Sequence, residues 1–194
     1  MRTFTIALIT IFPLAVSADP KPTTQACLGT FDQFLTCPAG ARRAGTECRA
    51  QSQHWSGSSR QGPALFLRSD GKTVSFAASY KDHKKTGRVY RFDDHGRLES
   101  WADVVDDQDH GLSVTCLPDG RVWYLAYYDH GKVSGISRSW RASDGAFVAA
   151  VGHDAAGHAQ RVDVSPQEQV RPDALCRPAR CDVGAKPDTS GLGK

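Results

Sequence analysis

A repeat with a period of 24 or 25 residues constrains the fold of this 194-residue chain more than any other feature. Each unit opens with a glycine and holds a second glycine in a central turn. The leading glycines are Gly62, Gly87, Gly111 and Gly135, and the second glycines are Gly71, Gly96, Gly120 and Gly145. Self-similarity at a fixed period indicates an array in which each unit buries its apolar face against its neighbours.

Apolar residues alternate within each unit, as they do in a β-strand. The positions three and five residues after the leading glycine hold Leu65, Tyr90, Val114 and Arg138, then Leu67, Phe92, Cys116 and Trp140. The positions three and five after the second glycine hold Val74, Glu99, Trp123 and Val148, then Phe76, Trp101, Leu125 and Ala150, and we expect both sets to face the core. Each unit is therefore predicted to be a β-hairpin. Because a single hairpin is only marginally stable in water, the hairpins should pair edge to edge. They would form a single twisted antiparallel meander, an all-β fold.

The chain divides into four predicted segments. Residues 1–18 resemble a signal peptide, because Arg2 precedes an apolar run that is too short for a bilayer span and ends in a small-x-small triplet at Ala18. Residues 19–54 form a leader and N-terminal cap, residues 55–164 the repeat domain, and residues 165–194 a Pro/Gly-rich tail that we expect to be mobile beyond Cys181. Cleavage after Ala18 would export the chain to the periplasm or the medium; the alternative is an uncleaved N-terminal anchor.

Export implies that the cysteines form disulfides. The array places Cys48 more than two hairpins from Cys116, too far for a direct bond. We expect local pairing within the N-terminal group and within the C-terminal pair, with one N-terminal cysteine reaching Cys116 if the leader folds back across the sheet. The disulfide candidates are Cys27, Cys37 and Cys48 near the N-terminus and Cys176 and Cys181 near the C-terminus.

Two segments resemble the bacterial variant of the MORN repeat: residues 127–135 (YYDHGKVSG) and residues 94–100 (DHGRLES). The resemblance extends over about residues 55–164 and implies a solenoid of β-hairpins. In that family the repeats act chiefly as scaffolds or interaction surfaces, some members associate with membranes or phospholipids, and some bacterial relatives are labelled antitoxin components. Val104 replaces the usual tyrosine of the repeat, and Arg138 occupies an apolar position.

Charge and motifs argue against several functions. A formal net charge of +3 provides no basic field for nucleic acid and no support for association with a membrane surface. The chain has no nucleophile elbow, no His-Glu-x-x-His motif and no phosphate-binding glycine loop. We therefore predict no catalytic activity and no cofactor.

Two sets of polar residues in the sequence suggest metal binding. Five histidines fall in turns between units and should line one edge of the sheet, where they would bind Zn²⁺ or Cu²⁺ or form solvated turns: His83, His110, His130, His153 and His158. An acidic run could hold Ca²⁺ or form a solvated turn: Asp103, Asp106, Asp107 and Asp109.

Aromatic residues near strand ends favour a binding surface, and Tyr124, Tyr127 and Tyr128 are the candidates for stacking on a glycan or peptide. The sequence thus predicts an exported, non-catalytic binding or scaffold protein whose partner is a protein or envelope component. The alternatives are a small periplasmic enzyme or metal-binding protein that uses the histidine edge, and an immunity-like partner of a secreted toxin.

Overall fold

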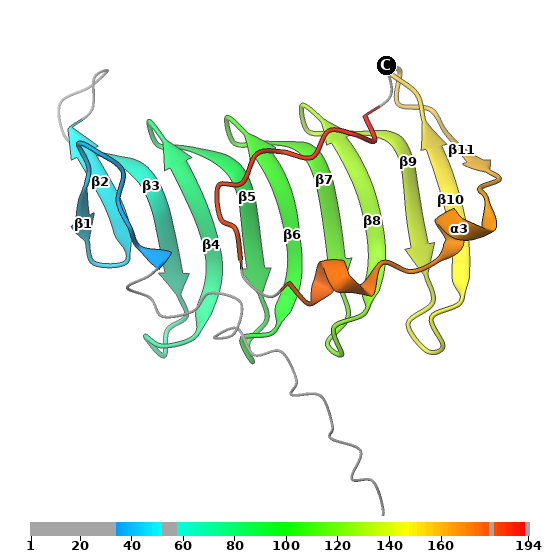
Figure 1. The fold of residues 1–194 in the computed structure, drawn as a ribbon, viewed down its shortest axis with the longest axis horizontal. Coiled ribbons are helices and arrows are strands. Elements are labelled where there is room, and N and C mark those ends of the chain that lie inside the picture. Colours follow the sequence, from blue (N-terminus) through cyan, green and yellow to red (C-terminus); the bar gives the residue numbers. More distant parts are fainter. Residues whose placement is uncertain (1–33, 52–57, 179–180, 193–194) are drawn as a thin grey trace, which may run out of the picture.

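The computed structural model describes residues 34–51, 58–178 and 181–192, and it contains one antiparallel sheet of 11 strands that follow chain order (Figure 1). This arrangement confirms the predicted all-β meander. The strands are β1 (Arg42–Ala44), β2 (Glu47–Gln51), β3 (Ser58–Leu67), β4 (Val74–Lys81), β5 (Lys84–Phe92), β6 (Leu98–Val105), β7 (Gln108–Cys116), β8 (Val122–Asp129), β9 (Lys132–Trp140), β10 (Phe147–His153) and β11 (Ala159–Val162). The sheet therefore begins within the predicted leader.

Two kinds of turn connect the strands. The repeat units are the hairpins β3–β4, β5–β6, β7–β8 and β9–β10, and each closes through its second glycine, which has a positive φ. Successive units are joined by two-residue turns at Asp82–His83, Asp106–Asp107 and His130–Gly131. All six residues have positive φ, as type I′ hairpin turns require.

Every hairpin carries a β-bulge shortly after its central turn. Between β7 and β8, Cys116 pairs with Val122 and Thr115 pairs with Tyr124, so Trp123 is the inserted residue. The other three hairpins shift register at the corresponding point. Because a bulge places one extra residue in a strand, it changes which side chains face the core.

The predicted core positions of the second strand are therefore partly wrong. In units two to four the residue two positions after the second glycine faces inward, as Val122 does, and the residue three positions after it does not. In the first unit one more residue separates the second glycine from the strand that follows, so Val74 and Ala77 enter the core whereas Phe76 belongs to a separate cluster. The side chains that lie outside the main core against expectation are Phe76, Glu99, Trp123 and Val148. The first-strand positions are as predicted, with Arg138 as the polar exception.

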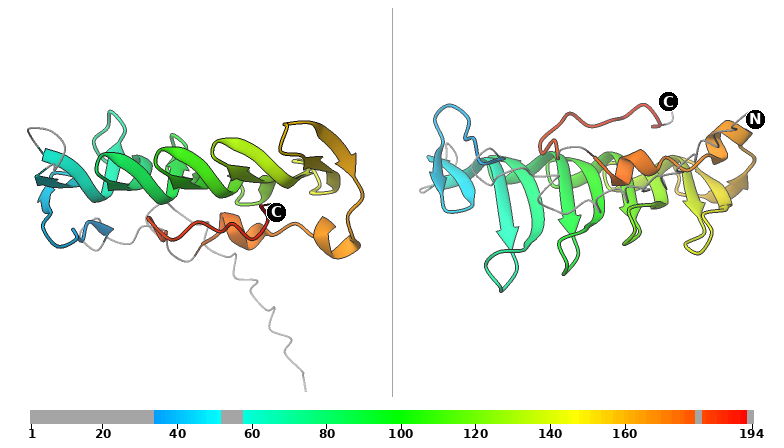
Figure 2. Two further views of the ribbon diagram at one scale, coloured as in Figure 1. Left: turned by 90° about the horizontal axis from the view of Figure 1, so that it is seen from above. Right: turned by 60° about the horizontal axis from the view of Figure 1, so that its bottom comes forward.

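The two faces of the sheet have different surroundings. The main core includes Leu65, Tyr90, Phe92, Val114 and Trp140 on one face. Strand alternation places a smaller cluster on the other face: Ala64, Ala78, Tyr80, Val89 and Val104, with Phe66, Phe76 and Ala102 packed against it. Among the described residues, the C-terminal segment covers only the first of these faces (Figure 2). We call this the strap face and the other the open face.

The C-terminal segment, residues 165–178 and 181–192, is not a loose tail. This strap contains α3 (Pro166–Gln169) and the 3₁₀ helix η1 (Asp173–Cys176), runs back from the last strands to β5, and then turns to cross the sheet a second time (Figure 1). Trp140 and Trp101 donate their indole N–H groups to the strap carbonyls of Gln169 and Leu175, both at 2.8 Å. A polar side chain of the strap also bonds the backbone of the sheet: Asp173 accepts a hydrogen bond from the Val122 amide at 2.9 Å.

One disulfide lies at the N-terminal end of the sheet and another joins the strap to its middle. Cys37 is bonded to Cys48, in agreement with the expected local pairing and with the absence of a Cys48–Cys116 bond. Cys116 is bonded to Cys176, so the expected Cys176–Cys181 bond is wrong. Cys116 is therefore bonded to the strap and not to a cysteine of the leader. Cys181 is also disulfide-bonded, whereas Cys27 lies outside the described residues.

No helix within the described ranges is long and apolar enough to cross a membrane. The predicted signal peptide lies outside those ranges.

Candidate binding face and histidine cluster

Aromatic and arginine side chains meet on the open face of the first repeat unit. Phe66 packs against Phe76 and Tyr80, with ring centroids 5.7 and 6.4 Å apart. The Arg60 guanidinium lies 5.4 Å from the Phe66 and Tyr80 ring centroids, and that of Arg91 lies 5.3 Å from the Phe76 centroid. These cation–π contacts hold two positive charges over the aromatic cluster.

Arg60 is also held by an acidic neighbour. Its guanidinium pairs with Glu47, which binds Arg49 through its second carboxylate oxygen at 2.6 Å. Burial raises the pKa of Glu47, but the hydrogen bonds from Arg60 and Arg49 outweigh this effect and leave that pKa below its ordinary value. Glu47 therefore stays ionised at neutral pH and orients both arginines.

A second group of aromatic residues lies on the open face of β8. Trp123 occupies the bulge with 50% of its surface exposed, and Tyr124 and Tyr128 follow on the same face by strand alternation. Val148, 44% exposed, occupies the bulge of β10, two strands away and roughly 10 Å from Trp123. Burial, with Tyr124 close by, raises the pKa of Tyr128, so this phenol stays neutral.

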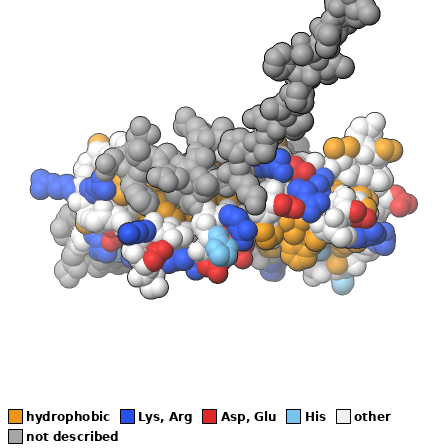
Figure 3. All heavy atoms as spheres, turned by 90° about the horizontal axis from the view of Figure 1, so that it is seen from below, with side chains coloured by type: hydrophobic (Ala, Val, Ile, Leu, Met, Phe, Trp, Pro, Cys, Tyr) orange, Lys and Arg blue, Asp and Glu red, His pale blue; other side chains and the backbone are white. Residues whose placement is uncertain are grey.

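The turns that contain the second glycines form the lower edge of the sheet in Figure 1, and Trp123 and Val148 each follow one of them. Figure 3 shows this edge from below, with hydrophobic surface gathered over the later strands and bordered by charged side chains. Trp123 and Val148 are exposed, so two of the bulges bring apolar side chains to the surface near this edge.

The three tyrosines proposed as surface-binding residues do not share one surface. Tyr127 packs against the main core on the strap face, where its ring lies next to Gly191 of the strap. Tyr124 and Tyr128 remain together on the open face. Trp123, which the sequence pattern placed in the core, joins them instead.

The five histidines lie along the upper edge of the sheet but do not form one cluster. His83 accepts a hydrogen bond from the Arg60 amide at 3.4 Å, and His158 lies 2.9 Å from an Asp154 carboxylate oxygen. His153 contacts the hydroxyl of Ser137 at 3.1 Å and lines a pocket of about 410 Å³ beside His158. Ser137 itself is buried, with 3% of its surface exposed, whereas His153 is partly exposed.

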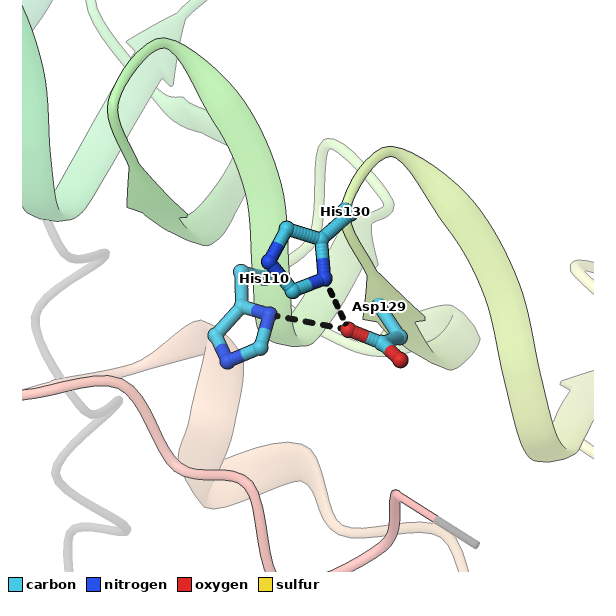
Figure 4. A group of neighbouring side chains, drawn as sticks. All are labelled: His110, Asp129 and His130. Atoms are coloured by element: carbon cyan, nitrogen blue, oxygen red, sulfur yellow. Dashed lines mark hydrogen bonds and ion pairs between the residues drawn. The ribbon is translucent and has the colours of Figure 1, made fainter.

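His110 and His130 are brought together around Asp129 (Figure 4). The Nδ1 atoms of His110 and His130 lie 3.2 and 2.5 Å from the same Asp129 oxygen, Oδ1, and the two imidazole rings meet edge to face with centroids 4.9 Å apart. Candidate donor atoms of all three side chains lie within 4.8 Å of one another.

The acidic run does not form one cluster. Asp103 is fully buried and binds Arg88 through both oxygens, at 2.8 and 3.0 Å. Asp106 and Asp107 form the exposed turn between β6 and β7. This separation leaves no support for the Ca²⁺ hypothesis.

No family model matches the chain, and no curated protein sequence matches it significantly. A crystal structure of TarM is similar with a TM-score of 0.34 and 19% identity, over 52% of this chain and 19% of that one. A crystal structure of an S. aureus TarM mutant in complex with Fondaparinux, alpha-GlcNAc-glycerol and UDP gives a TM-score of 0.34 and 16% identity, over 63% and 21% of the two chains. The chain thus spans about a fifth of the length of these structures, and its function has to be argued from its own residues.

Proposed function

We propose that this chain is an exported, non-catalytic binding protein whose MORN-like array presents the open face of the sheet to a protein partner. The exposure of Trp123 carries the proposal. Trp101 and Trp140 are 3% and 1% exposed and bind the strap through their indole groups, whereas Trp123 keeps half its surface in water. A solvent-exposed tryptophan on a rigid sheet is the kind of residue that dominates protein interfaces.

The composition of the open face supports a protein ligand. Tryptophan, tyrosine and arginine are enriched among the residues that contribute most to protein–protein affinity. This face carries Trp123, Tyr124 and Tyr128, together with Arg60 and Arg91 in ordered cation–π contacts. Preordered side chains lose less conformational entropy on binding.

Export is supported by the disulfides Cys37–Cys48 and Cys116–Cys176, since such bonds persist in oxidising compartments. The sequence adds the predicted signal peptide that ends at Ala18. An envelope or secreted protein is accordingly the partner to search for.

The test is capture from the envelope fraction of the native cell on immobilised protein, followed by affinity measurement with the captured partner. Trp123→Ala should weaken binding about 30-fold, the loss of a strong interface residue. Val170→Ala is the matched control, because Val170 is an exposed apolar residue (70%) on the strap. Equal affinities for wild type and Trp123→Ala, with both proteins folded, would refute the open-face proposal.

The identity of the captured protein also tests the immunity-like alternative. A secreted toxin whose activity is suppressed on binding would support that role within the same binding mode. Any other envelope protein would favour the scaffold role.

A further inference from the structure

Strand pairing positions the side chains of His110, Asp129 and His130, which together are called the His110 cluster. His110 belongs to β7, Asp129 is the last residue of β8, and His130 begins the turn into β9 with a φ of 47°. The amide of Gly131 donates a hydrogen bond of 2.8 Å to the carbonyl of Asp109, which ties this turn to β7. The backbone therefore holds His130 beside His110 without help from the side chains.

The donor atoms converge in a way that suits a metal ion. Both imidazoles direct Nδ1 at one carboxylate oxygen of Asp129, at 3.2 and 2.5 Å. Ligands about 2.0–2.1 Å from a tetrahedral Zn²⁺ lie roughly 3.3 Å from one another. Small side-chain rotations of the exposed His130 would bring all three donors to that spacing.

In addition, one polar atom of this cluster has no hydrogen-bond partner among the described residues. The Nδ1 atom of His110 is buried from solvent and has no hydrogen bond of adequate geometry, although Asp129 is 3.2 Å away. A buried polar atom without a well-aligned partner is costly, and native structures usually provide one. A metal ion between the three side chains would satisfy the Nδ1 lone pair and retain the carboxylate charge.

We propose that His110, Asp129 and His130 form a binding site for a divalent transition metal, with Zn²⁺ as the ion used to probe it. Two imidazole nitrogens and one carboxylate oxygen suit Zn²⁺ better than Ca²⁺ or Mg²⁺, which take oxygen ligands. The side chains of His130 and Asp129 are 73% and 53% exposed, so the ion keeps at least one position open to water or to a ligand.

This site lies at the opposite edge of the sheet from Trp123, the residue that carries the proposed binding function. The His110 cluster lies beside the turn between units, at the upper edge of the sheet, whereas Trp123 lies beside the central turn of its hairpin, at the lower edge. Loss of metal binding and loss of partner binding can therefore be measured separately.

The test is isothermal titration of Zn²⁺ into tag-free protein with its disulfides intact, after treatment with a chelator and its removal. We expect one site per chain that His110→Gln weakens at least tenfold, because it removes one of three ligands. The control is His158→Gln. His158 is an exposed histidine 2.9 Å from Asp154, and although His153 lines the same pocket, these side chains do not form a converging donor group among the described residues. It should leave the Zn²⁺ affinity unchanged.

A second variant separates ligand loss from misfolding. Asp129→Asn keeps the shape of an exposed side chain and removes its charge, so its unfolding temperature without metal should stay near that of wild type while Zn²⁺ affinity falls at least tenfold. The proposal is overturned if wild type binds no Zn²⁺, if the two cluster variants bind it as wild type does, or if His158→Gln loses as much affinity as His110→Gln.

Discussion

Gly87 and Gly111 occupy the places where the returning strap crosses the sheet. A Cβ added to Gly87 would lie 2.4 Å from the backbone of Gly184, and one added to Gly111 would lie 3.0 Å from the carbonyl oxygen of Asp188. Both glycines also have positive φ. At Gly87 and Gly111 the recurrent glycine therefore has two roles, since it permits the backbone conformation and leaves room for the strap.

Gly87→Ala should destabilise the protein by roughly 2–4 kcal/mol, through an unfavourable φ and overpacking against Gly184. Gly71→Ala is the matched control, because Gly71 has a similar φ of 66° and nothing within 4 Å of an added Cβ. Its cost should be about 1 kcal/mol. Urea unfolding of the two variants measures both values, and equal losses would show that the strap does not contact Gly87 in solution.

The buried pair of Arg88 and Asp103 joins the strap to the sheet. Arg88 binds Asp103 through two hydrogen bonds and lies 3.8 Å from the ring centroid of Trp101. The amide of Asp188 donates a further hydrogen bond to Asp103 at 2.8 Å. Asp103 has no exposed side-chain surface, so its charge depends entirely on these partners.

Asp103→Ala should cost about 3 kcal/mol, at the lower end for a broken buried pair because Arg88 keeps partial access to water. Asp163→Ala, at an exposed aspartate after β11, should change stability by less than about 0.5 kcal/mol. Denaturant unfolding provides the measurement. A loss below about 1 kcal/mol for Asp103→Ala would contradict the buried geometry.

At the scale of elements, the central turns depend on aspartate side chains that accept backbone hydrogen bonds. Asp70 accepts bonds from the amides of Lys72 and Thr73, both at 2.8 Å, and Asp93 accepts bonds from those of His95 and Arg97. The hydrogen bond from the Thr73 hydroxyl and the two amide bonds lower the pKa of Asp70 to about 2. At Asp93 burial raises the pKa, but the hydrogen bonds outweigh it and the pKa is again lowered.

These shifts predict that stability falls in acid. A carboxyl whose pKa is lower in the folded state contributes stability above its unfolded pKa and loses it as pH falls through the folded value. The window here extends from about pH 4 down to about pH 2, as set by Asp70. The thermal unfolding temperature should therefore fall steadily as the pH is lowered across this range. Asp93→Asn, which keeps an acceptor oxygen but does not titrate, should reduce the slope, and an unchanged slope would contradict the role assigned to Asp93.

The hairpins were predictable from the sequence, but their bulges were not. Alternation and turn glycines are local signals, so the four units and the inward side chains of their first strands, such as Phe92, follow from them. A bulge adds a residue without any local signal in the sequence. The alternation pattern therefore placed Trp123 in the core. The same limit applies to the histidines. Their common edge followed from the repeat, whereas the meeting of His110 with His130 depends on the register between β7 and β8.

At the scale of the whole molecule, the strap gives the single-layer sheet a second layer on one face. It supplies Leu175 and Val183 to the core and connects to the sheet through Cys116–Cys176. Its aperiodic, proline-rich sequence gave no sign of this route, because the contacts join residues far apart in the chain and rest on single side chains such as Asp173. The sequence pattern consequently predicted that the segment beyond Cys181 is mobile.

Replacing Cys116 and Cys176 with alanine should destabilise the protein by about 4 kcal/mol, whereas the same change at Cys37 and Cys48 should cost about 3 kcal/mol. The difference arises because the two bonds close loops of different length. The sequence separation is 60 for Cys116–Cys176 and 11 for Cys37–Cys48. Urea unfolding compares the two variants. Limited proteolysis should cleave the strap first in the Cys116 variant, and a larger loss for the Cys37 variant would contradict the anchoring role of the strap.

The central claim is that the strap occupies one face of the array and leaves the other for a partner. Photocrosslinking tests it most directly, with a photoreactive amino acid placed at Trp123 in one protein and at Val170 in another, each irradiated with the captured partner. The account predicts a crosslinked complex from the Trp123 position and none from the Val170 position. Crosslinking from Val170 alone would show that the partner binds the strap, and would contradict the assignment of the open face.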